Sequence, residues 1–243
     1  MNMEDMVIAS VDDHIIEPPT MFDAHVPKEL LTTMPRYITG ADGHAFWHWE
    51  AEDKTTFNIG LNAVVGRPKE EYGMEPANID QMRRGTWDAK AHIDDMNVGG
   101  IYTSVCFPTF IGFDGSWLWD AKDKGLAERV VQAYNDWHID EWCGPFVGRY
   151  IPTAVLPLWD LDASLRELKR LVKKGCRSVT FPSNPSIKGL KPIHDPAYEP
   201  IWAFCNEHHV VLNCHIGTGQ APLYASEMSP ISAWISSLPM AIS

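Results

Sequence analysis

Val7-Ile8-Ala9-Ser10-Val11-Asp12-Asp13-His14 is the stretch that decides the fold, because a short apolar run ends there in two carboxylates and an imidazole. An apolar run of this length is typical of a buried strand. Residues two apart on a strand project to the same face, so Asp12 and His14 are predicted to point together. A carboxylate and an imidazole aimed at one point form half of a metal site. Asp13 faces the other way and is interpreted as an exposed or turn-forming residue.

A second stretch of the same kind lies about 200 residues later, at Val210-Val211-Leu212-Asn213-Cys214-His215-Ile216-Gly217. An apolar strand again ends in one histidine, His215, before a glycine-rich turn. Two strand ends that each carry a potential ligand indicate one active site at the mouth of a parallel barrel. Asp12, His14 and His215 are therefore the predicted metal ligands, and Zn²⁺, Mn²⁺ and Fe²⁺ all suit two imidazoles and a carboxylate.

Strand and helix patterns alternate along the rest of the chain. The expected strands are 7–12, 101–107, 150–158, 176–181 and 210–215, and the expected helices are 88–97, 124–142, 160–174 and 196–208. Such alternation with nearly continuous apolar strands predicts an α/β fold with a parallel sheet covered by helices. A closed barrel and an open doubly wound sheet both fit. The recurrence of ligand-type residues at strand ends favours the (β/α)8 TIM barrel.

Residues 18–87 do not follow this alternation and are rich in proline, glycine, tryptophan and charge. An excursion after the first strand is expected to cover the catalytic face of a barrel, so we interpret it as a cap-like insertion. Eight strand–helix units need about 250 residues without insertions, whereas only five strands are predicted and 220–243 can hold one helix at most. We therefore expect residues 1–243 to form a single incomplete barrel that is truncated at its C-terminal side.

The composition of the chain indicates which partners the protein binds and in which cellular compartment it is found. The chain has 243 residues, 45% of them hydrophobic, and a net charge of −12, which repels phosphate backbones and makes nucleic acid an unexpected partner. No apolar run reaches the length of a membrane span, and the acidic N-terminus does not resemble a secretory signal. Five cysteines without regular spacing indicate buried reduced thiols, so a cytoplasmic protein is expected.

Three motifs resemble one family. Ser10 to Pro19 resembles the opening of amidohydrolase-related (amidohydrolase 2) proteins of the aminocarboxymuconate-semialdehyde decarboxylase type. Trp87-Asp88 with His92 to Asn97 and Gly99-Gly100 resembles their first barrel helix, and Cys214 to Gly217 resembles their strand-five metal ligand. The resemblance spans most of the chain outside the insertion.

The resemblance implies a metal-dependent barrel enzyme, with Zn²⁺ as the first expectation and Mn²⁺ or Fe²⁺ as alternatives. It implies a decarboxylase or hydrolase of small carboxylated, including aromatic, compounds, and a homodimer as an arrangement seen in relatives. Hydrolysis of C–N, C–O or C–C bonds without decarboxylation, and an inactive barrel fragment, remain the alternatives. The family's acid/base histidine and its final aspartate would fall beyond Ser243, so the catalytic acid/base is unassigned.

Weaker candidates for contact with the substrate follow from position alone. His194 lies in the loop after the fourth strand, and Arg83 and Arg84 precede the first helix, where either could pair with a substrate carboxylate. Glu17 is predicted either to orient His14 or to cap the Pro18-Pro19 turn. His92 and His138 lie on expected helices and are interpreted as surface or packing residues.

Overall fold

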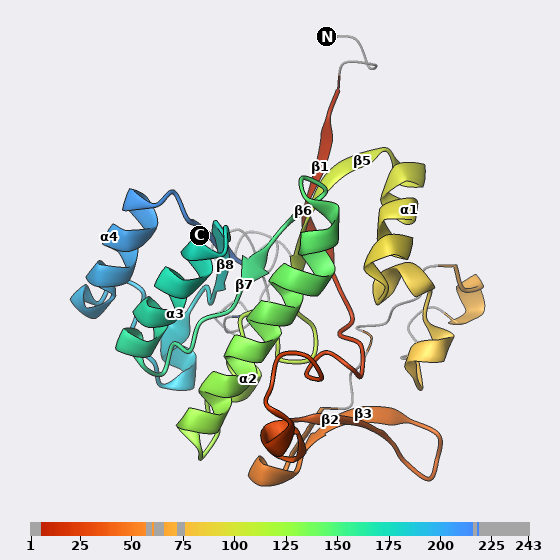
Figure 1. Ribbon diagram of the computed structural model, residues 1–243, viewed down its shortest axis with the longest axis horizontal. Coiled ribbons are helices and arrows are strands. Elements are labelled where there is room, and N and C mark those ends of the chain that lie inside the picture. Colours follow the sequence, from red (N-terminus) through yellow and green to blue (C-terminus); the bar gives the residue numbers. More distant parts are fainter. Residues whose placement is uncertain (1–5, 57–59, 61–65, 72–75, 216–217, 219–243) are drawn as a thin grey trace, which may run out of the picture.

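A computed structural model describes residues 6–56, 60, 66–71, 76–215 and 218. The predicted cap-like insertion is described except for its gaps between residues 57 and 75, and residues 220–243 lie outside the described part. Parallel strands lie in the middle of the molecule and α-helices lie around them (Figure 1).

The parallel strands are β1 (Ile8–His14), β5 (Ile101–Phe107), β6 (Tyr150–Ile151), β7 (Thr153–Ala154), β8 (Ser178–Phe181) and β9 (Val211–Cys214). They form two three-stranded sheets of order β1-β5-β6 and β7-β8-β9, so strands that follow one another in the chain lie side by side. The expected single strand 150–158 is instead two short strands separated by Pro152, because proline has no N–H to donate to a ladder. The rest of that apolar run, residues 155–158, is buried without being strand.

The expected closed barrel is not found among the described residues. β1 pairs only with β5 there and β9 only with β8, so each leaves one edge without a described partner, and closure needs further strand pairing across those edges. The predicted α/β class with parallel strands is confirmed, while the number of strand–helix units stays a prediction.

The α-helices are α1 (Ala89–Gly99), α2 (Lys124–Trp137), α3 (Leu161–Lys173) and α4 (Glu199–Glu207). Asp88, Asp123 and Asp160 cap the first three, each accepting a hydrogen bond from the backbone N–H three residues later. Gly100, at φ 71°, ends α1 in the left-handed conformation that glycine adopts without steric cost. The first and third expected helices are confirmed within a residue or two.

Shorter helical turns connect these elements. The expected helix 124–142 is α2 followed by a π-helical turn, η8 (His138–Cys143), and the expected helix 196–208 begins as a 3₁₀ turn before α4. The 3₁₀ turns are η2 (Lys28–Thr33), η3 (Glu50–Glu52), η4 (Lys69–Glu71), η5 (Ile79–Gln81), η6 (Arg84–Thr86), η7 (Ser116–Leu118), η9 (Gly144–Phe146), η10 (Pro185–Lys188) and η11 (Pro196–Tyr198).

The insertion contains an antiparallel sheet of β2 (Arg36–Thr39), β3 (Ala45–Trp49) and β4 (Lys54–Thr56). Trp47 stacks on Phe110 with ring centroids 4.4 Å apart, and Trp49 stacks on Trp117 at 5.7 Å. The sheet thus packs against the loop that follows β5, far from the amino-terminal end of β1 (Figure 1). Its role as a cap stays a prediction.

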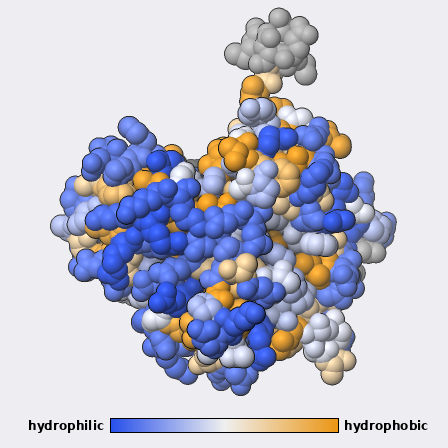
Figure 2. Space-filling view, viewed as in Figure 1, coloured by the Kyte–Doolittle hydropathy of each residue, from blue (hydrophilic) through white to orange (hydrophobic). Residues whose placement is uncertain are grey.

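The core has two apolar clusters. One joins the insertion to α1 and α2 and includes Trp47, Trp49, Tyr134 and Trp142, and the other packs β7, β8, α3 and α4 around Phe181. Burying this aromatic surface is the main stabilising contribution to such a fold. Apolar surface also remains exposed near the amino-terminal ends of β1 and β5 (Figure 2), where Val7, Ile8, Val11 and Tyr102 are accessible.

None of the helices in the described residues is long and apolar enough to cross a membrane.

His138, predicted as a surface or packing residue, is fully buried beside Tyr134, and its Nε2 accepts a hydrogen bond from Thr153 N at 3.3 Å. Burial lowers its pKa to about 3. Between pH 6.5 and about 3, His138 binds a proton in the unfolded chain but not in the folded chain. Its contribution to folding stability is therefore fully present above pH 6.5 and is lost as the pH falls. We expect this group to remove about 2 kcal/mol of unfolding free energy between pH 7 and pH 5.

Urea unfolding of wild type and His138→Gln at both pH values tests this expectation. Glutamine can still accept from Thr153 N but does not titrate, so the variant should lose less stability on acidification. An equal loss in both proteins would contradict the assignment.

Candidate metal centre

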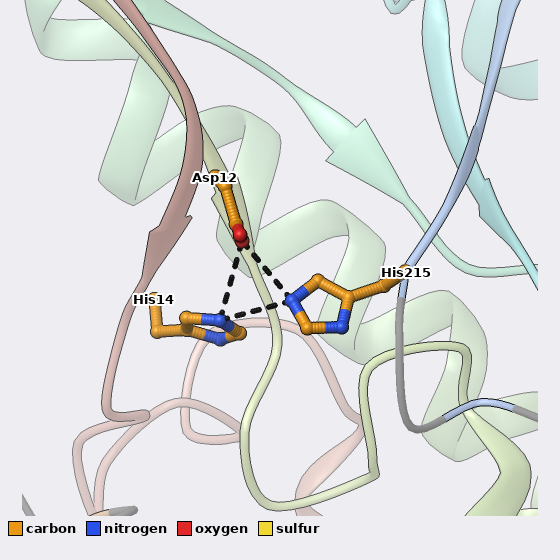
Figure 3. Close-up of side chains that lie close together, drawn as sticks. All are labelled: Asp12, His14 and His215. Atoms are coloured by element: carbon orange, nitrogen blue, oxygen red, sulfur yellow. Dashed lines mark hydrogen bonds and ion pairs between the residues drawn. The ribbon is translucent and has the colours of Figure 1, made fainter. Parts of the chain in front are cut away.

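Asp12 and His14 lie at the carboxyl end of β1, and His215 directly follows β9. β1 and β9 belong to different sheets, yet both strands end on the same side of the molecule. The three side chains converge on one point from two strand ends, as Figure 3 shows. The structure therefore brings together all three residues that the sequence singled out as metal ligands.

The spacing of the three ligand atoms suits a metal ion. His215 Nε2 lies 3.0 Å from Asp12 Oδ1 and 3.2 Å from His14 Nε2, and His14 Nε2 lies 3.5 Å from Asp12 Oδ1. Ligands about 2.0–2.1 Å from zinc in a tetrahedron are about 3.3–3.4 Å apart, and adjacent ligands of an octahedral ion are about 3.0 Å apart. The geometry thus accommodates a divalent ion and leaves its identity open.

Burial and charge favour the neutral, metal-binding form of His14. The His215 side chain is 8% exposed and that of His14 is 30% exposed, whereas Asp12 is more open at 63%. Burial and the neighbouring His215 lower the pKa of His14, which favours the neutral imidazole that binds metals. Asp12 supplies the negative charge that a divalent cation needs.

Phenylalanine rings surround the two imidazoles. The Phe113 ring lies 4.3 Å from the His215 ring and 4.8 Å from the His14 ring, and the Phe107 ring lies 4.9 Å from His215, measured between centroids. These apolar walls restrict the orientations of the histidines and limit the access of water to their Nε2 atoms.

Asp13 is not the exposed residue that the sequence indicated. Its Oδ2 lies 3.0 Å from His92 Nε2 and accepts a hydrogen bond from Ser104 Oγ at 2.8 Å, while its Oδ1 accepts from His14 N at 3.0 Å. His92 Nδ1 in turn contacts Gly85 O at 2.8 Å. The alternation of side chains along the strand correctly predicted that Asp13 points away from Asp12 and His14. That opposite face is covered by α1, so the Asp13 carboxylate contacts His92 there and is not exposed.

The charges of this pair reinforce each other. Burial lowers the pKa of His92, but Asp13 outweighs it and the net pKa is raised; burial likewise raises the pKa of Asp13, and His92 and Ser104 outweigh it. Cys106 lies close enough to complete a second metal-type cluster, yet burial raises the pKa of its thiol to about 12, which opposes the thiolate form that binds metals. The group is better described as an ion pair that anchors the end of β1.

Replacing His92 with glutamine is expected to weaken metal binding about 10-fold, because the anchor holds the residue between two ligands. Titration of the purified chain with Zn²⁺ against a competing chelator measures the affinity. Lys90→Gln, on the exposed side of α1, is the matched control and should bind as wild type does. Unchanged affinity in His92→Gln would show that β1 positions Asp12 and His14 without the anchor.

Of the three residues predicted to contact substrate, only Arg83 lies close to the candidate ligands. Arg83 forms a bidentate pair with Asp95 at 2.7 and 2.5 Å, and Arg84 pairs with Asp88 at 2.7 Å. Arg83 lines a cavity of about 380 Å³ that also reaches Asp12 and His14. His194 is exposed in the loop before α4, and it is not among the residues that line this cavity. The structure thus brings Arg83, but not His194, into a cavity shared with Asp12 and His14.

Glu17 neither orients His14 nor caps the proline turn. Its buried carboxyl accepts hydrogen bonds from Thr109 N at 2.8 Å and Phe110 N at 3.0 Å, and burial raises its pKa to about 7. It ties the chain that leaves β1 to the loop that leaves β5. No spacing in the sequence links positions 17 and 109, so this role could not be read in advance.

A second cavity, of about 280 Å³, is lined by seven residues of the loop after β5, between Thr109 and Trp117, together with Thr56, Lys188 and Thr218. One of the seven, Phe113, also contacts the rings of His14 and His215. The residues of this cavity were not predicted as site residues. Only their position in the chain could have indicated these residues. The loop after β5 and the loop after β8 each follow the carboxyl end of a parallel strand, where barrel enzymes place their active sites.

Comparison with known proteins gives a family and a fold. A family model described as amidohydrolase matches residues 22–241, a range that includes His215 and begins after Asp12 and His14. Matching solved structures number 28 chains, among them the crystal structure of an amidohydrolase from Mycobacterium avium subsp. paratuberculosis K-10, with a TM-score of 0.66 and 20% sequence identity. That match covers 87% of this chain and 59% of the other, so the chain spans less than two thirds of its length, and the likeness shows the fold. No curated protein matches the sequence.

Proposed function

The chain belongs to the amidohydrolase family, and from that premise we propose that Asp12, His14 and His215 bind a divalent metal ion used in catalysis on small carboxylated compounds. The observation that carries the proposal is the convergence of one carboxylate and two imidazole nitrogens within 3.5 Å of one another.

A divalent ion at this position supplies Lewis acidity, which polarises a carbonyl or carboxylate oxygen and lowers the pKa of water. The residues of the chain do the rest. His14 and His215 present their Nε2 atoms from fixed positions between Phe107 and Phe113. Asp12 balances charge, and the ion pair of Asp13 and His92 holds the end of β1 in register. Such preorganisation lowers the reorganisation needed when charge develops on the substrate.

Decarboxylation is our first proposal for the reaction, on the resemblance of Ser10 to Pro19 to decarboxylases of the aminocarboxymuconate-semialdehyde type. Hydrolysis of a C–N, C–O or C–C bond is the alternative, since the same three ligands serve both. We propose Zn²⁺ as the metal, with Mn²⁺ and Fe²⁺ as alternatives, and a homodimeric assembly.

The five cysteines are free, and four of them are buried, which supports a reducing, cytoplasmic setting.

The test is metal-dependent turnover by the purified 243-residue chain. A chelator removes bound metal, and mass spectrometry verifies the metal content. Zn²⁺ or Mn²⁺ is then restored, and the protein is assayed with a panel of carboxylated aromatic and enoic acids and with their amides and esters. Release of CO₂ identifies decarboxylation, whereas release of amine or alcohol identifies hydrolysis. Absence of stoichiometric metal binding after restoration would contradict the proposed centre.

A further inference from the structure

The cavity of about 280 Å³ is lined by the loop after β5 and by Thr56, Lys188 and Thr218. Phe113 lines it and also contacts the rings of His14 and His215. Thr218 Oγ1 donates to His215 O at 2.6 Å. A molecule in this cavity therefore lies next to the residues proposed to bind metal.

Asp114 gives this cavity a buried acceptor. The residue is 1% exposed, and its Oδ1 accepts a hydrogen bond from Ser116 N at 3.0 Å. Its Oδ2 is buried and has no hydrogen-bond partner among the described residues, and the same holds for the hydroxyl of Thr109, which lines the cavity too. Buried polar atoms are nearly always bonded, because leaving one unpaired costs the full desolvation of the group. A ligand with an O–H or N–H group would satisfy Asp114.

Lys188 brings a positive charge to the same cavity. It ends η10 in the loop after β8, and its ammonium lies 5.6 Å from the centroid of the Trp119 ring. In the part of the chain that the structure describes it forms no ion pair, unlike Lys191 in the same loop, which lies 3.5 Å from Asp195. The charge of Lys188 acts on the carboxylate of Asp114 and favours its ionised form, although no close ion pair joins the two described side chains. A cation held at a small cavity in this way suits an anionic group of a ligand.

The size and walls of the cavity limit the body of that ligand. Its volume is slightly below the range of about 300–1,000 Å³ typical of sites for drug-sized molecules. Phe110, Phe113 and Trp117 supply flat apolar surface. These features fit a compound with a single ring.

We infer that this cavity is the substrate subsite of the proposed metal centre, in which Lys188 pairs with the anionic group of a small ring compound and Asp114 accepts a hydrogen bond from its hydroxyl or amine. The inference rests on the proposed function. It makes Lys188 and Asp114 the residues that determine specificity, in place of His194, Arg83 and Arg84.

Three probes separate the two contacts: 4-hydroxybenzoate carries both groups, benzoate only the carboxylate, and phenol only the hydroxyl. Dissociation constants are measured by calorimetry on the metal-loaded full chain at pH 8, because burial raises the pKa of Asp114 and this pH favours its ionised form. Lys188→Met should weaken 4-hydroxybenzoate and benzoate about 10-fold and leave phenol unchanged.

Asp114→Asn should produce the complementary pattern, weakening 4-hydroxybenzoate and phenol about 10-fold and sparing benzoate. Ser116 N donates to Oδ1, so the asparagine should keep its oxygen at that position and place its NH₂ group where Oδ2 was. That NH₂ group is itself a donor and cannot accept a hydrogen bond from the hydroxyl of the ligand. Lys191→Met is the matched control and should bind all three probes as wild type does. Thermal unfolding of each variant verifies that it is folded.

The outcomes separate this inference from the proposed function. Equal weakening of all probes by either variant, or no change in any, overturns the subsite while metal content on the same samples still tests the metal centre. If each variant weakens only the two probes predicted for it, but the protein binds no metal, the result would support the ligand site and contradict the metal-dependent function. Failure of wild type to bind any probe also overturns the inference.

Discussion

Replacing His215 with alanine is expected to reduce the metal affinity of the chain by about 100-fold or more. Loss of residues that only support a ligand already costs about 10–100-fold, so loss of a ligand should cost at least the upper value. His215 is also the least exposed of the three proposed ligands, and its Nε2 lies within 3.2 Å of Asp12 Oδ1 and His14 Nε2. Without it, Asp12 and His14 form only a two-ligand site at the end of one strand.

Metal content after dialysis, measured by mass spectrometry, and Zn²⁺ titration together test this expectation. His14→Ala should show a similar loss. His44→Ala is the matched control, because His44 is exposed in the turn between β2 and β3 and contacts only Asp42 among charged groups of the described residues. Full metal content in His14→Ala and His215→Ala would rule out the assigned centre, whatever the activity of the wild type.

Replacing Asn135 with alanine is expected to lower the unfolding free energy by about 3–4 kcal/mol. Asn135 is fully buried on α2, where its Nδ2 donates to Val155 O at 3.0 Å and to Glu167 Oε1 at 2.8 Å. Its Oδ1 accepts from Val155 N at 2.9 Å. The variant leaves the N–H and the carbonyl of Val155 unpaired in the core, just after β7.

Urea unfolding measures this loss, and Asn206→Ala, at an exposed position of α4, should change stability by no more than about 0.5 kcal/mol. Asn135→Asp sharpens the test. It keeps an acceptor for Val155 N but places a carboxylate 2.8 Å from the position of Glu167 Oε1, so near neutral pH it should destabilise at least as much as alanine. A loss below about 1 kcal/mol in Asn135→Ala would show that Val155 finds other partners.

The parts of the fold that could be predicted are those set by neighbouring residues. Asp88 and Asp160 accept hydrogen bonds from amides three positions later, and Gly100 adopts a conformation that its missing side chain allows. Both α1 and α3 lie within two residues of the helices predicted at 88–97 and 160–174. Pro152 shows how the same reasoning failed, because an apolar run hid a residue that cannot donate to a strand ladder, and one expected strand became β6 and β7.

The candidate site divides in the same way. Asp12 and His14 were recognisable because strand alternation places them on one face, and His215 because it ends a similar strand. Asp13 was misjudged because alternation says which face a side chain takes but not what covers that face. Here α1 covers it and supplies His92.

The sequence by itself determined the alternation of strands and helices, the helix caps and the chemistry at the ends of β1 and β9, since these depend on residues a few positions apart. Only the tertiary structure decided that His215 meets Asp12 across 203 positions, that Glu17 bonds the loop after β5, and that Asp114 and Lys188 share a cavity. Those contacts depend on the packing of whole elements, because the distance between two side chains far apart in sequence is fixed by how strands pair and loops fold over them rather than by any local periodicity.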